Sequence, residues 1–104
     1  MPAMAKRVLE DARAKVAALI NGENEKTIIF TGSATEANNL AIKGAALRNM
    51  SKGKEVVASA IEHMSVLNPM KELQKNGFTL SLIPVDSTGI VDLKRLDKAL
   101  TKNT

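Results

Sequence analysis

The spacing of hydrophobic residues along the chain alternates between a helical and a strand-like period. Apolar residues recur at helical spacing from Val8 to Ile20, and Asn21 and Gly22 then supply residues that favour the left-handed backbone at a helix end. The next apolar run, from Thr27 to Thr31, is short, rich in β-branched residues and bounded by glycines. This pattern predicts an amphipathic helix followed by a buried strand.

The same alternation continues through the middle of the chain. Small and apolar residues at helical spacing predict a second helix from Ala34 to about Met50, and the run Glu55 to Ala60 predicts a second strand. A third helix is expected from Val66 to Asn76. Pro69 is expected in the first turn of that helix, because a missing N–H costs little there.

The last third of the chain completes the pattern. Gly77 is expected to end the third helix, and a third strand is expected from Thr79 to Val85. A turn at Asp86–Gly89 and a cap at Asp92 then predict a final helix. Strands joined by helical crossovers run parallel. The sequence therefore predicts an α/β fold with a parallel sheet between layers of helices, and residues 1–104 are expected to form a single domain.

Composition and charge exclude several classes of function. The 104 residues include no cysteine and one histidine, so neither a disulfide framework nor a thiolate zinc site is possible, and no metal site is predicted. The net charge is +4, but basic residues such as Lys71 and Lys75 alternate with acids such as Glu72, which is typical of a solvated helix face. Because no apolar run is long enough for a membrane span, we expect a cytoplasmic protein without a membrane partner. The mixed charges and an aromatic content of 2% likewise argue against a nucleic acid as partner.

Two segments are candidates for chemistry, because both follow predicted strands at the edge of the sheet where ligands bind. The first is Gly32–Glu36, at the start of the second helix. Ser33 with Glu36 three residues later is a capping box, which satisfies helix-end amides. The same geometry leaves other amides free to bind a phosphate. At this point both interpretations stay open, although the segment is neither a P-loop nor a GxGxxG motif.

The second candidate is Glu62–His63, directly after the second predicted strand. A lone histidine is more often a structural hydrogen-bonding residue than a catalyst. At this edge of the sheet, however, the ring of His63 is also suited to stacking on a heterocycle or moving a proton. Glu62 is expected to be a solvated or helix-capping acid.

The residues from Ile28 to Gly44 closely resemble the cysteine desulfurases of the class V aminotransferase family. Ser59–His63, and Gly77 followed by Ile83–Val85, agree with that family in order and spacing. The resemblance implies that the chain is the early part of the large domain of a transferase that depends on pyridoxal 5′-phosphate, with the three-layer α/β/α fold of the aspartate aminotransferase class.

The resemblance also implies an activity and a site. Such enzymes convert L-cysteine to L-alanine and pass the sulfur, as a persulfide, to an acceptor protein for iron–sulfur cluster assembly. Ala34 and Thr35 match the pair that holds the cofactor phosphate, and His63 matches the catalytic histidine that stacks on the pyridine ring. One departure is visible, because many relatives have Ser-Gly where this chain has Gly32-Ser33.

The family's cofactor-linked lysine and its sulfur-accepting cysteine match no residue of this chain. We therefore expect the 104 residues alone to be an inactive fragment of a desulfurase. Alternatives are a fragment of a selenocysteine lyase or another class V relative, and a non-enzymatic domain that binds a phosphate ligand or acts as a scaffold. In the family's sheet, the first strand is separated from the next two by strands that come later in the sequence. Thr27–Thr31 must then pair with Glu55–Ala60, stay exposed or pair with the sheet edge of another copy of the chain. We therefore expect a homo-oligomer.

Overall fold

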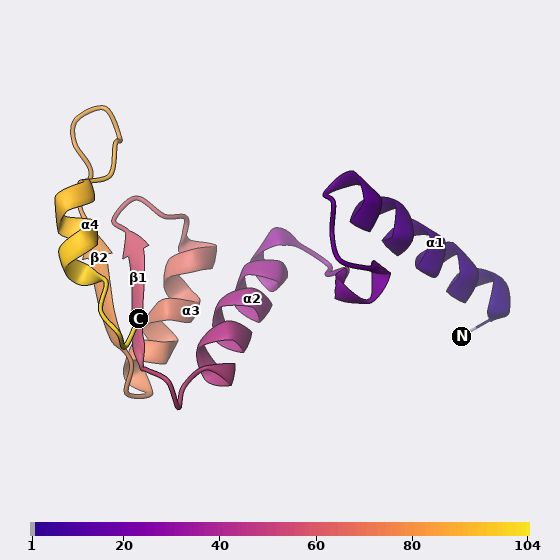
Figure 1. Ribbon diagram of the computed structural model, residues 1–104, viewed down its shortest axis with the longest axis horizontal. Helices are drawn as coiled ribbons and strands as arrows, with labels where there is room; N and C mark the ends of the chain where they lie inside the picture. The colour runs from indigo at the N-terminus through magenta and orange to yellow at the C-terminus, as the bar shows by residue number, and fades with distance from the viewer. Residues whose placement is uncertain (1) are drawn as a thin grey trace. The chain divides into compact units, whose positions relative to one another are not determined.

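The computed structural model describes residues 2–104, and it divides into two compact units. One unit ends at Thr31, and the other runs from Gly32 to Thr104. The first contains one long helix and a short helical turn, whereas the second contains both strands and the remaining helices (Figure 1). None of the helices in the described part of the chain combines the length and the apolar character that a membrane crossing requires.

The first unit is built on helix α1, Ala3–Leu19, which confirms the amphipathic helix that the sequence predicts. Asn21, two residues after the helix ends, has a φ of +55°, which lies in the left-handed region. The Gly22 amide then donates to the carbonyl oxygen of Ala17 over 2.7 Å. Ala17 is the helix's buried residue, while Val8 and Leu19 remain 63% and 84% exposed. The apolar stripe of α1 is therefore largely uncovered.

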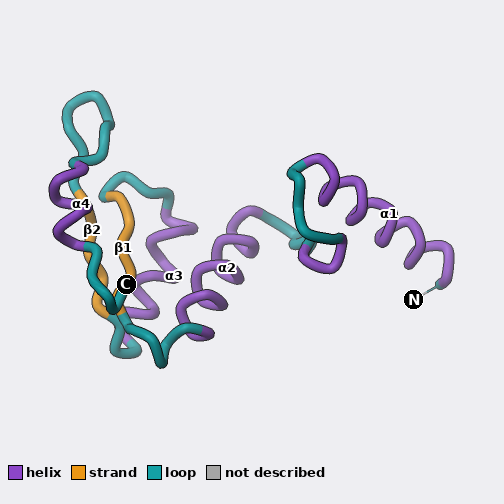
Figure 2. The backbone as a smooth tube through the Cα atoms, viewed as in Figure 1, coloured by secondary structure: helices purple, strands orange, loops and turns teal. Residues whose placement is uncertain are grey.

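The predicted strand at Thr27–Thr31 is wrong. Glu25–Thr27 forms a short 3-10 helix, η1, capped by Asn24, and Ile28 is extended without being part of a strand (Figure 2). Instead, the guanidinium of Arg13 donates to the Ile28 carbonyl and lies 4.9 Å from the centre of the Phe30 ring. The apolar run has high β propensity, but a strand also needs a hydrogen-bonded neighbour.

The second unit contains a parallel pair of strands, β1 (Glu55–Ser59) and β2 (Thr79–Ile83). Their register pairs Glu55 with Thr79 and Ser59 with Ile83. The crossover helix α3, Met64–Lys75, and the last helix α4, Leu93–Ala99, are drawn on opposite sides of the strands in Figure 1. This arrangement confirms the predicted α/β fold with a parallel sheet, and its core contains the buried side chains of Leu73, Phe78 and Ile83.

Helix α3 begins earlier than the sequence predicts, and this changes the position of its proline. His63 is the N-cap and Met64 the first helical residue, so Pro69 is inside the helix rather than in the first turn. The prediction for Pro69 is therefore wrong. Its missing N–H removes one backbone bond of the second turn, but its ring is buried, and burial of the ring offsets part of that loss.

Helix α2, Ala34–Arg48, packs against α3, and an ion pair between Lys43 and Glu72 joins the two helices. The hydrogen bond from Lys43, and then its charge, lower the pKa of Glu72. Beyond β2, the predicted third strand is shorter than expected, and Val85 makes a single antiparallel bridge with Val91.

The turn and cap that follow are confirmed. The Asp86 carboxylate accepts hydrogen bonds from the Thr88 hydroxyl and from the backbone amides of Thr88 and Ile90. The Thr88 hydroxyl, and then the Ile90 and Thr88 amides, lower the pKa of Asp86. Asp92 caps α4 by accepting from the Arg95 amide over 3.1 Å.

Within residues 2–104, a backbone hydrogen bond to the edge of β1 that faces away from β2 is found only where the strand begins. The amide of Glu55 donates to the carbonyl oxygen of Asn103 over 3.1 Å, so the C-terminal residues cross the start of this edge. Gly53 lies against this backbone contact, and a Cβ atom on Gly53 would be 2.1 Å from the carbonyl oxygen of Asn103. Glycine is therefore needed at this position for the close approach of two backbones.

Candidate functional site

The first candidate segment forms the N-terminus of α2. The Ser33 hydroxyl accepts from the Glu36 amide over 3.1 Å, and the Glu36 carboxylate accepts from the Gly32 amide over 2.9 Å. The first bond confirms Ser33 as the N-cap, whereas the Glu36 carboxylate bonds the amide one residue before the N-cap and not the Ser33 amide that a capping box would use. Within residues 2–104, the amides of Ala34 and Thr35 donate to no protein acceptor. The cap therefore leaves two N–H groups at the positive end of the helix dipole.

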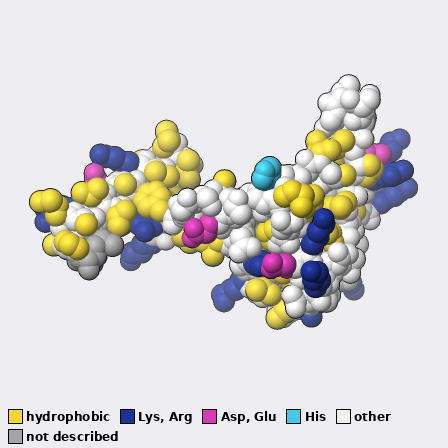
Figure 3. All heavy atoms as spheres, turned by 180° about the vertical axis from the view of Figure 1, so that it is seen from behind, with side chains coloured by type: hydrophobic (Ala, Val, Ile, Leu, Met, Phe, Trp, Pro, Cys, Tyr) yellow, Lys and Arg dark blue, Asp and Glu magenta, His cyan; other side chains and the backbone are white. Residues whose placement is uncertain are grey.

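His63, the second candidate, caps helix α3 directly after the loop that follows β1. Its Nδ1 atom accepts from the Ser65 amide over 3.0 Å and lies 2.9 Å from the Ser65 hydroxyl oxygen. The residue is exposed, and the histidine side chain is visible at the molecular surface in Figure 3. Glu62 is also exposed and accepts from the Ser59 hydroxyl over 2.8 Å. His63 thus has a structural role that leaves Nε2 and the ring faces accessible.

The structure brings the two segments together through the packing of α2 on α3. Thr35 and Ser65 line one open hollow of about 330 Å³, together with Ser33, Glu36, Asn39, Asn68, Pro69 and Glu72. Most of these side chains are polar, and both carboxylates already accept from donors on Gly32 and Lys43. His63 is two residues from Ser65 and is bonded to it, but it does not line the hollow itself.

Sequence reasoning missed two residues of this arrangement. Asn38 of α2 donates from Nδ2 to the Ser65 hydroxyl oxygen over 2.9 Å, and this bond is partly buried. The signal for Ser65 is its place two positions after a histidine at a helix start, where its amide can reach the cap. Asn38 follows Ala34 by one helical turn, which puts the two residues on the same face of α2.

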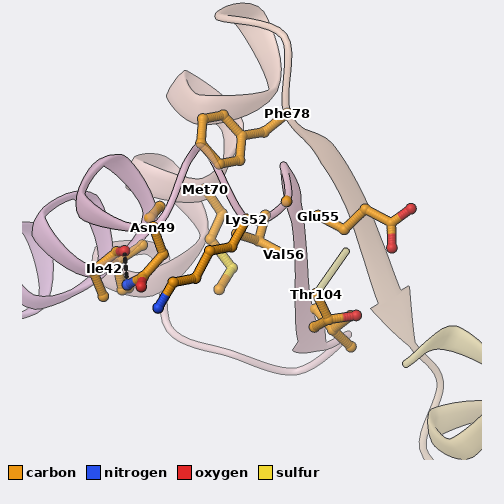
Figure 4. Close-up of a pocket in the computed structure, with 12 residues that line it drawn as sticks. Ile42, Asn49, Lys52, Glu55, Val56, Met70, Phe78 and Thr104 are labelled. Atoms are coloured by element: carbon orange, nitrogen blue, oxygen red, sulfur yellow. Dashed lines mark hydrogen bonds between the residues drawn. The ribbon is translucent and has the colours of Figure 1, made fainter. Parts of the chain in front are cut away.

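A larger hollow of about 420 Å³ lies between α2, α3 and β1 (Figure 4). Apolar side chains such as Ile42, Val56, Met70 and Phe78 dominate its lining, and the Asn49 amide turns away to donate to the Ala45 carbonyl over 2.8 Å. Neither Thr35 nor His63 contributes to it. Its lining suits packing against apolar groups rather than binding of a phosphate.

Comparison with known proteins gives a consistent result. The family model described as aminotransferase class V matches residues 1–104. Cysteine desulfurase IscS 1 of Archaeoglobus fulgidus is 52% identical over 100 residues, which are 96% of this chain and 26% of that protein. Cysteine desulfurase IscS of Dictyoglomus turgidum is 46% identical over 96 residues, 92% of this chain and 24% of its own length.

Solved structures agree with the sequence relatives. A NifS-like protein superposes with a TM-score of 0.88 at 36% identity, covering 97% of this chain and 28% of its own. DndA from Streptomyces lividans superposes with a TM-score of 0.87 at 31% identity, covering 97% of this chain and 28% of its own. The structure described as SspA in complex with cysteine has a TM-score of 0.81 at 32% identity, covering 97% of this chain and 29% of its own. The chain belongs to the class V aminotransferase family, whose members are pyridoxal-phosphate-dependent enzymes, and it spans about a quarter of the length of these relatives.

Proposed function

We propose that this chain supplies the phosphate-binding and ring-contacting part of a pyridoxal 5′-phosphate site in a cysteine desulfurase. The observation that carries the proposal is the free pair of amides at Ala34 and Thr35 beside a histidine-capped helix, joined to it by the bond between Asn38 and Ser65. The relatives at 52% and 46% identity are cysteine desulfurases, which supports the choice of enzyme.

The phosphate would be held at the start of α2. A phosphate needs several N–H or O–H donors and a positive potential, and the amides of Ala34 and Thr35, the Thr35 hydroxyl and the helix dipole supply both. The exchange of glycine and serine at residues 32 and 33 does not remove this capacity, since the Ser33 hydroxyl serves as the cap. These residues therefore fit the phosphate of the cofactor.

The pyridine ring would lie against His63. The Ser65 amide holds Nδ1 of the imidazole, so rotation of the ring is restrained while its faces and Nε2 stay accessible. An exposed, oriented imidazole fits a flat heteroaromatic ligand, and it can hold or move a proton at Nε2. When bound, pyridoxal 5′-phosphate supplies the electron sink for bond cleavage in an amino-acid substrate.

For the whole enzyme, we propose L-cysteine as the substrate and a sulfur-acceptor protein as the partner, with the sulfur used for iron–sulfur cluster assembly. The structural relative SspA is described in complex with cysteine, which supports this substrate. The present chain holds no cysteine to accept sulfur. We therefore expect the 104 residues to bind the cofactor's phosphate and ring without producing alanine from L-cysteine.

The proposal is tested by calorimetric titration with pyridoxine 5′-phosphate and with inorganic phosphate. Pyridoxine 5′-phosphate lacks the aldehyde, so it cannot react with the chain's lysines. Thr35→Val should weaken both ligands by about tenfold, because one hydrogen bond to a charged group is lost. His63→Ala should weaken pyridoxine 5′-phosphate alone. Thr79→Val, an exposed threonine on β2, is the matched control.

The two variants also separate the candidate functions. Loss of pyridoxine 5′-phosphate binding in both variants supports a cofactor site. If Thr35→Val weakens both ligands and His63→Ala weakens neither, the chain is a phosphate-binding domain without a ring site. Binding that is unchanged in both variants overturns the assignment of Thr35 and His63.

A further inference from the structure

We infer that Asn38 and Ser65 are positioning residues: they fix the ring of His63 with its proton on Nε2 and keep it in register with the free amides of α2. The inference concerns a three-residue relay, defined as Asn38, Ser65 and His63, which spans the contact between α2 and α3. It rests on the proposed function, since the ligand that His63 would meet is the ring of the cofactor.

The direction of the relay follows from one backbone amide. The Ser65 N–H points at Nδ1 of His63 over 3.0 Å, so Nδ1 must be an acceptor and cannot carry a proton in the neutral ring. In the bond between Nδ1 and the Ser65 hydroxyl, 2.9 Å from the same atom, the hydroxyl is then the donor. Its oxygen is left as an acceptor, and the Nδ2 group of Asn38 supplies the donor over 2.9 Å. If the Asn38 amide were flipped, its oxygen and not its Nδ2 group would face the Ser65 hydroxyl oxygen, and that oxygen would lose its donor.

The relay determines whether Nε2, the outward-facing nitrogen of His63, is a donor or an acceptor. With Nδ1 held as an acceptor, the neutral imidazole carries its hydrogen on Nε2. His63 therefore presents an N–H donor, not a lone pair, on its accessible side.

The relay also links the two halves of the proposed site. Asn38 is one helical turn beyond Ala34, at the start of α2, and Ser65 is in the first turn of α3. Their bond is partly buried and crosses between the helices close to the hollow that Thr35 and Ser65 share. A shift of α2 along α3 would break this bond. Asn38 thus fixes the position of His63 relative to the amides of Ala34 and Thr35.

The test is 15N NMR of the imidazole in the ligand-free chain, at a pH where the ring is neutral. His63 is the only histidine, so its two ring nitrogens are assigned without ambiguity. The expected spectrum shows a protonated Nε2 and an unprotonated Nδ1. Ser65→Ala should raise the population ratio of the Nδ1–H to the Nε2–H form by about fivefold, the effect of one lost hydrogen bond.

Asn38→Asp provides a second, independent variant. The carboxylate cannot donate to the Ser65 hydroxyl and would accept its hydrogen instead, which removes that donor from His63. The same shift of the ring resonances is expected. The controls are Ser87→Ala, an exposed serine in the turn after β2, and Gln74→Glu, an exposed position on α3 with the same change of charge.

A wild-type spectrum with the proton on Nδ1 overturns the relay. The relay is also overturned if the ring resonances of Ser65→Ala and of Asn38→Asp both match those of the two controls. Because this measurement contains no ligand, it does not depend on the proposed function.

Titration with pyridoxine 5′-phosphate and inorganic phosphate then tests the link to the site. Ser65→Ala and Asn38→Asp should reduce the affinity for pyridoxine 5′-phosphate about fivefold more than that for phosphate. Equal effects on the two ligands overturn the positioning role. Wild-type protein that binds neither ligand contradicts the proposed function instead, while the tautomer result stands.

Discussion

Two apolar runs of similar composition behave differently in this chain. Thr27–Thr31 and Glu55–Ser59 are both short and rich in β-branched residues, yet only the second is a strand. Val56 and Ala58 lie opposite Leu80 and Leu82 of β2, whereas Ile29 remains 65% exposed. The difference shows that the partner, and not the intrinsic propensity, decides whether such a run becomes a strand.

The sharpest way to test this comparison is amide hydrogen exchange. Ile29 and Phe30 donate no backbone hydrogen bond within the described residues, while the amides of Val56 and Ala58 face β2. Because exchange requires opening of the hydrogen bond, we expect Ile29 and Phe30 to exchange at least about a hundredfold faster. NMR-detected exchange on dilute protein measures this ratio.

An internal control for the exchange experiment lies on β1 itself. The amides of alternate residues point to opposite edges, so Val57 faces away from β2. It should exchange much faster than its neighbour Val56. Slow exchange at Ile29 and Phe30 in dilute protein would mean that the first run pairs after all.

The same comparison explains how much of the fold the sequence could predict. The helices, both paired strands, the Asp86 turn and the Ser33 cap follow from local patterns, because their hydrogen bonds connect residues close in sequence or paired by a short crossover. The strand at Thr27–Thr31 was wrong because its pairing is not local. The position of Pro69 was wrong because burial of its ring stabilises a place in the helix that the backbone alone disfavours.

The candidate site likewise contains some residues that the sequence indicates and others that only the tertiary structure reveals. The positions after the predicted strands indicate the segment Gly32–Glu36 and His63, and the family resemblance implies Ala34 and Thr35 within that segment. Their roles toward a cofactor stay predictions. Asn38 and Ser65 were missed because their bond joins residues 27 positions apart in sequence on two different helices. Only the packing of α2 on α3 brings these side chains together.

The second prediction concerns the free edge of β1. Its outward amides and the apolar hollow beside it are open, so we expect self-association that grows with concentration. Val57→Pro should abolish it, because proline removes an outward N–H and leaves the bonds to β2 intact. Light scattering across a concentration series measures the mass.

Val56→Pro is the matched variant for this edge. The Val56 amide faces β2, so proline there removes a bond of the sheet and should unfold the second unit. Far-ultraviolet circular dichroism distinguishes this loss from a change of oligomeric state. A wild-type chain that stays monomeric at all concentrations contradicts the expected pairing.

The smallest effects on stability are expected from substitutions at two glycines of the second unit. A Cβ on Gly44 meets no atom within 4 Å, and Gly44 is in the middle of α2. Gly44→Ala should therefore raise the free energy of unfolding by about 0.5–1 kcal/mol, since alanine loses less backbone entropy in a helix. Gly53→Ala should lower it by about 1 kcal/mol, because displacing the Asn103 carbonyl breaks its bond to Glu55.

Urea denaturation measures both changes, and exchange of the Glu55 amide locates the second. Gly53 does not have a positive φ, so alanine meets no backbone strain there and the cost reports the contact with Asn103 alone. If Gly53→Ala leaves stability unchanged while the Glu55 amide exchanges faster, the C-terminal residues leave the β1 edge without cost. That edge would then be open along its whole length, and Val57→Pro alone would no longer suffice to block pairing with a second copy.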